Sequence, residues 1–160
     1  MSDWFQFIEQ RSDRDCAICC IAMALGRPYE EVLAAGLESK AFNPEKGCLR
    51  EYEVLEKLGL VMENRAGVET GDFVSRHRDW AISPDFFRSM AWGRKALLCV
   101  PSLNIDSGWH MVYSDGLRLW DPSRKKRYER FDQLQPNEII LFREGMRLPP
   151  AAVAEVRLAS

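Results

Sequence analysis

The chain contains only two histidines, His77 and His110, and His110 is followed eleven residues later by Asp121. An imidazole in hydrogen-bond contact with a carboxylate is a recurring part of sites for nucleophilic catalysis, because the carboxylate fixes the orientation and tautomer of the base. Asp115 and Gly116 lie between the two residues, and Asp-Gly is typical of a tight turn. The spacing therefore raises the hypothesis that a hairpin brings His110 and Asp121 together.

The pairing of the two strands follows from the turn type. A two-residue type I′ turn at Asp115 and Gly116 places His110 directly opposite Asp121, with their Cβ atoms about 4.5–5.5 Å apart on one face. Pro122 cannot donate to a strand ladder, so we expect the second strand to end there. The alternative is a histidine at the edge of the core with Asp121 as a structural partner. The same count pairs Ser114 with Leu117, Tyr113 with Arg118, Val112 with Leu119 and Met111 with Trp120.

A second feature supplies a nucleophile. The apolar run CAICCIAMAL is bounded by Asp15, a preferred N-cap, and by Gly26, a preferred helix stop. We therefore predict a buried helix over residues 16–25 with Cys16 in its first turn. The unpaired N–H groups and the dipole of a helix N-terminus favour a thiolate there, and an adjacent imidazolium favours it further. Cys16 then acts as nucleophile beside a histidine base and an orienting carboxylate.

The other cysteines have simpler interpretations. Cys19 and Cys20 share a helical face with Cys16 and Met23, and we expect both to point into the core as small hydrophobic residues. A Cys-x-x-Cys redox site at Cys16 and Cys19 is an alternative, although no βαβ pattern precedes it. Zinc binding by this cluster with a histidine is a further alternative, although paired Cys-x-x-Cys knuckles are absent.

Gln10, Asp15 and Cys16 form the pattern Gln-x4-Asp-Cys at the start of a helix rich in Ala, Leu and Met. This stretch resembles the start of the papain-like bacteriocin leader-peptidase family, the double-glycine peptidases. The family also has a helix that commonly ends in Leu-Gly-Leu, which residues 49–60 resemble. Its later strand starting at histidine and its second strand ending in Asp-Pro are matched by His110, Asp121 and Pro122.

The resemblance implies a papain-like fold and a role for each matched residue. Cys16 would be the nucleophile, His110 the general base and then acid, and Asp121 the residue that orients it. Gln10 would donate its side-chain amide to the oxyanion together with the backbone N–H of Cys16, and one such donor stabilises a transition state by about 2.7–4 kcal/mol. The sequence contains no transporter, so leader cleavage is not implied, and peptide, isopeptide and other amide bonds all stay open as targets.

The elements that must position these residues divide into helices first and strands afterwards, which is an α+β signature. We expect one papain-like domain over residues 1–145, with N-terminal helices packed on a C-terminal antiparallel sheet, followed by a tail over residues 146–160. The further predicted helices are 28–39, 48–60 (with Leu49, Tyr52, Leu55 and Leu58 on its inner face) and 83–93. The predicted strands are 95–103, 109–114, 117–121 and 138–143.

Composition narrows the class of protein. Hydrophobic residues make up 46% and charged residues 29% of the chain, and the net charge is −2. This balance gives no reason to expect binding to nucleic acid or to an anionic membrane. No stretch approaches about 18 continuous apolar residues, and the N-terminus lacks the apolar region of a secretory signal. The odd number of cysteines, five, is a poor disulfide framework, so we expect a reducing, cytoplasmic location.

Two further features have competing interpretations. We expect His77 in a solvated loop, although it is the one rival of His110 as the base. The basic run at residues 124–127 is expected to be a solvated turn, or else to bind an acidic part of a substrate, and Trp109 could line the cleft.

The leading hypothesis is a stand-alone bacterial or phage cysteine peptidase that acts on a peptide or protein through Cys16, His110, Asp121 and Gln10. No cofactor and no metal is expected, and no oligomeric state is predicted. The alternative is a papain-like module that has lost its chemistry and binds a peptide or partner protein.

Overall fold

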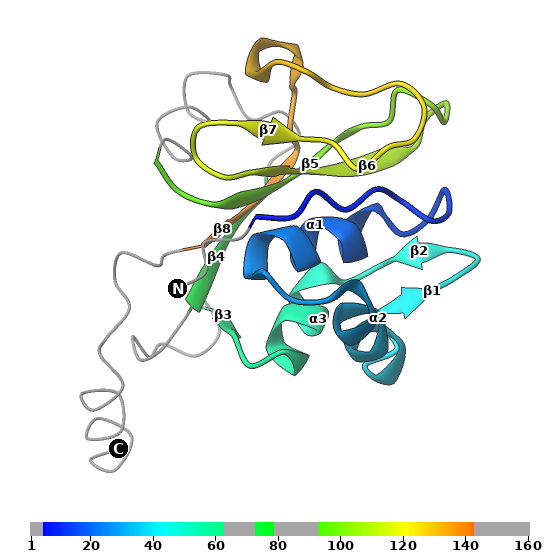
Figure 1. The fold of residues 1–160 in the computed structure, drawn as a ribbon, viewed down its shortest axis with the longest axis vertical. Coiled ribbons are helices and arrows are strands. Elements are labelled where there is room, and N and C mark those ends of the chain that lie inside the picture. Colours follow the sequence, from blue (N-terminus) through cyan, green and yellow to red (C-terminus); the bar gives the residue numbers. More distant parts are fainter. Residues whose placement is uncertain (1–4, 63–72, 79–92, 143–160) are drawn as a thin grey trace.

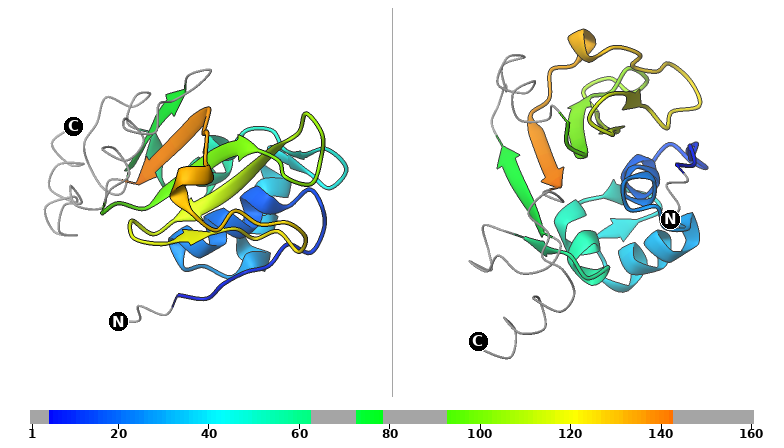
Figure 2. Two further views of the ribbon diagram at one scale, coloured as in Figure 1. Left: turned by 90° about the horizontal axis from the view of Figure 1, so that it is seen from above. Right: turned by 60° about the vertical axis from the view of Figure 1, so that its left-hand side comes forward.

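The computed structural model describes residues 5–62, 73–78 and 93–142, which form a mixed α+β fold (Figure 1). Three helices, α1 (Cys16–Leu25), α2 (Tyr29–Glu38) and α3 (Glu51–Lys57), lie together on one side of the larger sheet (Figure 2). Helix α1 packs directly against the sheet, and α2 packs on the outside of α1. No helix in these described ranges is both long enough and apolar enough to span a bilayer.

The larger sheet has six strands in the order β3-β4-β8-β5-β6-β7. Every neighbouring pair in it is antiparallel except β3 and β4, which are parallel. A separate small hairpin joins β1 (Phe42–Asn43) to β2 (Gly47–Cys48). The strands of the larger sheet are β3 (Val61–Met62), β4 (Phe73–Arg78), β5 (Ala96–Pro101), β6 (Trp109–Ser114), β7 (Leu119–Trp120) and β8 (Glu138–Phe142), and a short 3-10 helix covers Phe131–Gln133.

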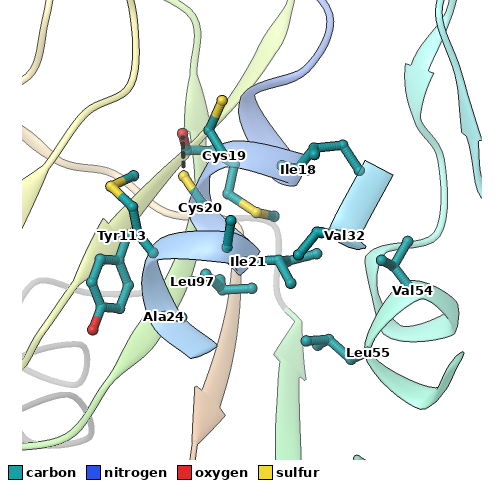
Figure 3. Packing of buried hydrophobic residues seen from close by; sticks show 14 of the residues in the cluster. Ile18, Cys19, Cys20, Ile21, Ala24, Val32, Val54, Leu55, Leu97 and Tyr113 are labelled. Atoms are coloured by element: carbon teal, nitrogen blue, oxygen red, sulfur yellow. Dashed lines mark hydrogen bonds between the residues drawn. The ribbon is translucent and has the colours of Figure 1, made fainter. Parts of the chain in front are cut away.

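Helix α1 is the centre of the main core, because every residue from Ala17 to Ala24 is buried. Ile18 and Ile21 are completely buried and pack with Val32 of α2 and Leu55 of α3 (Figure 3). Burial of each such side chain stabilises the fold by about 1.5–3 kcal/mol. Gly26 ends the helix in the left-handed conformation, with φ of 63°. The buried run and its two ends therefore fix the position of α1, and with it Cys16, against the sheet.

A second, smaller core lies on the other face of the sheet. Successive residues of β5 alternate between the two cores, with Leu97 in the main core and Leu98 in the second, as expected from the period of a strand. The segment after β7 covers this face with Tyr128 and Leu134, which are both buried. Both faces of the central strands are therefore covered. Strand β6, which carries His110, contributes residues to both cores.

The predicted α+β class is confirmed, as is the first helix with its bounds, but the β1–β2 hairpin lies between α2 and α3, so the strands do not all follow the helices. The second helix begins at Tyr29, so Pro28 is its N-cap and not its first residue. The third is shorter than predicted and begins at Glu51, which leaves Leu49 outside it and 61% exposed. The backbone N–H of Leu49 donates to the Ala41 carbonyl at 2.8 Å, so this residue extends the β1–β2 hairpin.

Four strands were not predicted, namely β1 and β2 of the small hairpin and β3 and β4 of the larger sheet. Val61–Met62 forms β3 and Phe73–Arg78 forms β4, so the expectation of a loop at His77 was wrong. The backbone of His77 pairs with that of Ile139, and two strands, β8 and β5, separate it from β6 in the sheet. The predicted helix at 83–93, apart from its last residue, and the predicted tail at 146–160 lie outside the described residues.

Candidate active site

Cys16 is the first residue of α1 and is half-buried, with its helix packed against β6. Asp15 is the N-cap, but its side chain makes no capping hydrogen bond, contrary to its expected role. The carboxylate instead accepts the backbone N–H groups of Arg11 at 3.0 Å and Ser12 at 3.2 Å and the hydroxyl of Tyr29 at 2.7 Å. Asp15 therefore closes the loop before the helix and leaves the N–H groups of the first turn to other acceptors.

His110 and Asp121 are in direct contact, as predicted, with 2.7 Å between Nε2 and Oδ1. The carboxylate is almost completely buried, and its two oxygens also accept the backbone N–H groups of Ser123 at 2.9 Å and Tyr128 at 2.8 Å. A buried carboxylate with three donors has one fixed position. The imidazole bonded to it is fixed as well.

The hairpin that makes this contact has a different turn from the predicted one. Tyr113 pairs with Trp120 and Ser114 with Leu119, so the loop covers residues 115–118 and the predicted direct pairing of His110 with Asp121 was wrong. The register differs by two residues, which keeps every side chain on its predicted face, and a diagonal neighbour is still within reach of a histidine.

The longer loop has a physical cause in Asp115. Its carboxylate accepts the backbone N–H groups of Leu117 at 2.8 Å and Arg118 at 2.7 Å, and Trp120 Nε1 at 3.0 Å. Gly116 has φ of 99°, but Asp115 does not adopt the positive φ that a type I′ turn requires. The side chain of Asp115 thus replaces the expected backbone turn.

The protonation of His110 follows from its surroundings. Burial lowers the pKa of the imidazole, but hydrogen bonds to Asp121 and Cys16 outweigh that effect and raise the pKa from 6.5 to about 9. Because Asp121 occupies Nε2, Nδ1 is the ring nitrogen available to Cys16. The arrangement therefore favours a charged imidazole between a carboxylate and a thiol at neutral pH.

Gln10 lies beside this group and is 7% exposed. Its backbone N–H donates to the Pro122 carbonyl at 2.8 Å, which ties the loop before α1 to the residue after Asp121. Its side-chain Nε2 donates one hydrogen to the Ser12 carbonyl at 2.9 Å. The amide has a second hydrogen, so one donor stays available beside Cys16.

Two hollows flank the pair of Cys16 and His110, and both are also lined by Asp13, Ile105 and Trp109. The first, here the Gln10 hollow, is further lined by Gln10, Ser102, Asn104, Ser123, Arg124 and Lys125. The second, here the Gly47 hollow, is further lined by Ala17, Gly47, Cys48, Cys99, Gly108 and Met111. A larger hollow elsewhere, between residues 6–11 and the junction of α1 and α2, contains neither Cys16 nor His110.

Three of the four remaining thiols are poor nucleophiles. Burial raises the pKa of Cys19, Cys20 and Cys48 well above the ordinary value, with neighbouring negative charges adding to the effect. Cys19 and Cys20 are completely buried, as predicted, and the thiol of Cys20 donates to the Met111 carbonyl at 3.3 Å (Figure 3). All five cysteines are free thiols. Among the described residues, no group of three His, Cys, Asp or Glu side chains could hold a metal ion.

Several residues of the site were not found from the sequence. Tyr29 completes the partners of Asp15, and Asn104 joins the loop after β5 to the segment after Asp121, with 3.0 Å from Nδ2 to Ser123 Oγ. Ile105 lines both hollows and is 38% exposed. These contacts join distant parts of the chain, and only the Asn in the turn-like stretch PSLNIDSG gave a local signal.

No protein-family model matches the chain, and no curated protein sequence matches it either.

Proposed function

We propose that the protein is a papain-like thiol hydrolase that cleaves a peptide or isopeptide bond. The observation that carries the proposal is the hydrogen bond of His110 to a buried carboxylate, with Cys16 at a helix N-terminus lining the same two hollows as His110. The three groups have the order of nucleophile, base and orienting carboxylate that activates a thiol. The thiols with raised pKa values lie in the core or beside it, and Cys16 is the thiol that stands at a helix N-terminus beside His110.

In the first half-reaction, the thiolate of Cys16 attacks the carbonyl carbon of the scissile amide. The carbonyl oxygen becomes an oxyanion, which accepts hydrogen bonds from the second amide hydrogen of Gln10 and from the backbone N–H of Cys16. The imidazolium of His110 then gives its proton to the leaving nitrogen, the C–N bond breaks, and a thioester on Cys16 is left.

In the second half-reaction, neutral His110 takes a proton from a water molecule, which attacks the thioester carbonyl. Collapse of this second tetrahedral species breaks the C–S bond, releases the acid and restores the thiolate and imidazolium. Asp121 acts throughout by holding Nε2 and by stabilising the positive charge on the ring. Transfer to an amine in place of water would use the same residues.

The proposal is tested by alkylation and turnover together. Iodoacetamide is expected to label Cys16 before any other thiol, and well below pH 8, because the neighbouring imidazolium stabilises the thiolate. The His110→Ala variant should label far more slowly at that pH, while His77→Ala, on a distant strand, should label like the wild type. Labelling of Cys16 no faster than that of a free thiol, with no cleavage of a peptide library, would favour the binding module and overturn the hydrolase.

A further inference from the structure

The two hollows beside Cys16 differ in charge. The charged residues of the Gly47 hollow are Asp13, Arg14, Lys46 and Glu51, so positive and negative groups balance there. The Gln10 hollow has Arg124 and Lys125 but shares only Asp13 as a negative group. A ligand that extends into the Gln10 hollow therefore meets a net positive charge within reach of the nucleophile.

Arg124 is the source of this excess. Lys125 Nζ lies 3.9 Å from Asp13 Oδ1, so its charge is partly balanced. Arg127, further along the same basic run, pairs with Glu9 at 2.6 Å. Within the described part of the chain, Arg124 has no acidic group at ion-pair distance. Lys126 has no such partner there either, but it does not line the Gln10 hollow, so Arg124 is the unpaired member of the run that faces a ligand in this hollow.

The backbone around Arg124 is held in place by Asn104. Asn104 Nδ2 donates to Ser123 Oγ and to the Lys126 carbonyl, both at 3.0 Å, and Asn104 Oδ1 accepts the backbone N–H of Lys126 at 3.0 Å. Ser102 Oγ in turn accepts the backbone N–H of Asn104 at 3.1 Å. Residues on both sides of Arg124 are therefore clamped, which lowers the entropic cost of binding a ligand there.

We propose that Arg124 binds a carboxylate of the substrate in the Gln10 hollow, and so selects amides with a negative charge close to the scissile bond. This inference rests on the proposed thiol hydrolase. A guanidinium suits a carboxylate because its planar N–H groups match the two oxygens in a bidentate pair. The carboxylate has two chemical sources, an acidic side chain of a longer peptide or the free C-terminus of a short one.

The first test measures binding apart from chemistry. The Cys16→Ala protein is titrated with fluorescent peptide pools that have Glu or Gln fixed at one position at a time, all C-terminally amidated. A matched pool without acidic side chains has a free C-terminal carboxylate. We expect one Glu position, or the free C-terminus, to bind about fivefold more tightly than its neutral counterpart, as for a partly exposed ion pair. Whichever pool gains affinity identifies the source.

The second arm places the effect on one residue. Adding Arg124→Gln to the Cys16→Ala protein should abolish the preference, while Lys126→Gln should preserve it, because Lys126 does not line the hollow. The two changes remove the same charge from neighbouring positions. Equal losses would show a general effect of net charge and overturn the inference, as would equal affinities for all acidic and neutral pools.

A parallel turnover assay separates this inference from the proposed function. The protein with Cys16 intact is incubated with the same pools and the products are counted by mass spectrometry. Cleavage without any preference for a carboxylate would keep the hydrolase and overturn the role of Arg124. A carboxylate preference that depends on Arg124, without any cleavage, would keep the binding site and overturn the hydrolase.

Discussion

The loops on the two sides of the candidate site are each built on a buried aspartate, Asp15 before α1 and Asp121 after β7. The two side chains have closely similar surroundings. Asp15 is 1% exposed and Asp121 is 4% exposed, and each accepts two backbone N–H groups and one donor from a side-chain ring, while Asp15 also accepts the thiol of Cys19 at 3.9 Å. In both loops, the buried carboxylate replaces a missing backbone partner and fixes the chain.

The third partner distinguishes them. Asp15 accepts the hydroxyl of Tyr29, and burial together with this hydrogen bond raises the pKa of that phenol, so its proton stays in place. Asp121 accepts from His110, whose pKa of about 9 lies close enough to neutral for the proton to be transferred in a reaction. A buried carboxylate therefore fixes the loop conformation at Asp15, whereas at Asp121 it also stabilises an imidazolium whose proton can be transferred.

The largest expected effect comes from Asp121→Asn. The change preserves volume but removes the charge that stabilises the imidazolium, and the analogous loss of an orienting carboxylate lowers kcat on the order of 10⁴-fold. The matched change, Asp15→Asn, should lower kcat only about tenfold through the placement of Gln10. The measurement is kcat on a cleaved peptide for both variants. Similar losses in the two would mean that Asp121, like Asp15, serves only the shape of its loop.

A smaller effect is expected at Gln10, which belongs to the first loop but is bonded to Pro122 of the second. Gln10→Ala should lower kcat by about 10²–10³-fold with little change in KM, because an oxyanion donor acts mainly in the transition state. Gln10→Glu is the control, since it keeps the length of the side chain and removes its donors. A wild-type rate in Gln10→Glu would exclude the amide as an oxyanion donor.

The sequence predicted different features of the two loops correctly: the boundary of the helix in the first and the contact of two side chains in the second. Asp15, Cys16 and Gly26 mark the ends of α1 by local preferences that act within a few residues, so its bounds were predicted correctly. The role of the Asp15 side chain was not, because its strongest partner is Tyr29 on the next helix. The preference of Asp for the N-cap position therefore predicted the correct start of the helix, although the Asp15 side chain makes no capping hydrogen bond.

In the second loop, the contact was predicted and its geometry was not. Asp-Gly indicated a two-residue turn, but the carboxylate of Asp115 stabilises a longer one through Leu117, Arg118 and Trp120. The contact of His110 with Asp121 was still predicted correctly because the predicted register was wrong by two residues, and a shift by an even number keeps every side chain on the same face. The partners of Asn104 lie in a loop far from it in the sequence, and no local pattern reports such contacts.

The two aspartates should also differ in their effect on the pH dependence of kcat/KM, because only Asp121 is expected to set the pH at which activity is lost. His110 has a pKa raised to about 9, so the imidazolium, and with it kcat/KM, should be lost as the pH rises through about 9. The same proton stabilises the fold fully below pH 6.5, and this contribution should disappear between about pH 6.5 and 9. Asp121→Asn should move the alkaline limb of kcat/KM to lower pH, because it removes the charge that raises the pKa of His110.

Asp15→Asn should leave the alkaline limb close to where it is, since the main groups that raise the pKa of His110 are Asp121 and Cys16. The profiles are measured for both variants at one ionic strength. If the alkaline limb moved equally in both variants, Asp121 would not be distinguished from Asp15 as the carboxylate that stabilises the imidazolium.

The smallest expected effect compares two tyrosines that contact these aspartates, Tyr29 at the start of α2 and Tyr128 after Asp121. Tyr29→Phe removes the side-chain donor of Asp15 and leaves a buried carboxylate short of one hydrogen bond, so the free energy of unfolding should fall by about 1–3 kcal/mol. Tyr128→Phe removes the bond of its hydroxyl to the Pro101 carbonyl at 2.6 Å but keeps the backbone N–H that Asp121 accepts. Urea denaturation measures the stability of both variants, and the alkaline limb of kcat/KM should stay in place in both.

The reason is that neither change alters a donor of Asp121, so the charge on His110 keeps its partner. If Tyr29→Phe moved the alkaline limb, the Asp15 loop would have to reach the imidazole electrostatically, through Cys19 and Cys16 at the start of α1. If only stability falls, the functional difference between the two buried carboxylates lies in the ring that donates to each: the phenol of Tyr29 keeps its proton and serves the structure, and the imidazole of His110 can release its proton and serves the chemistry.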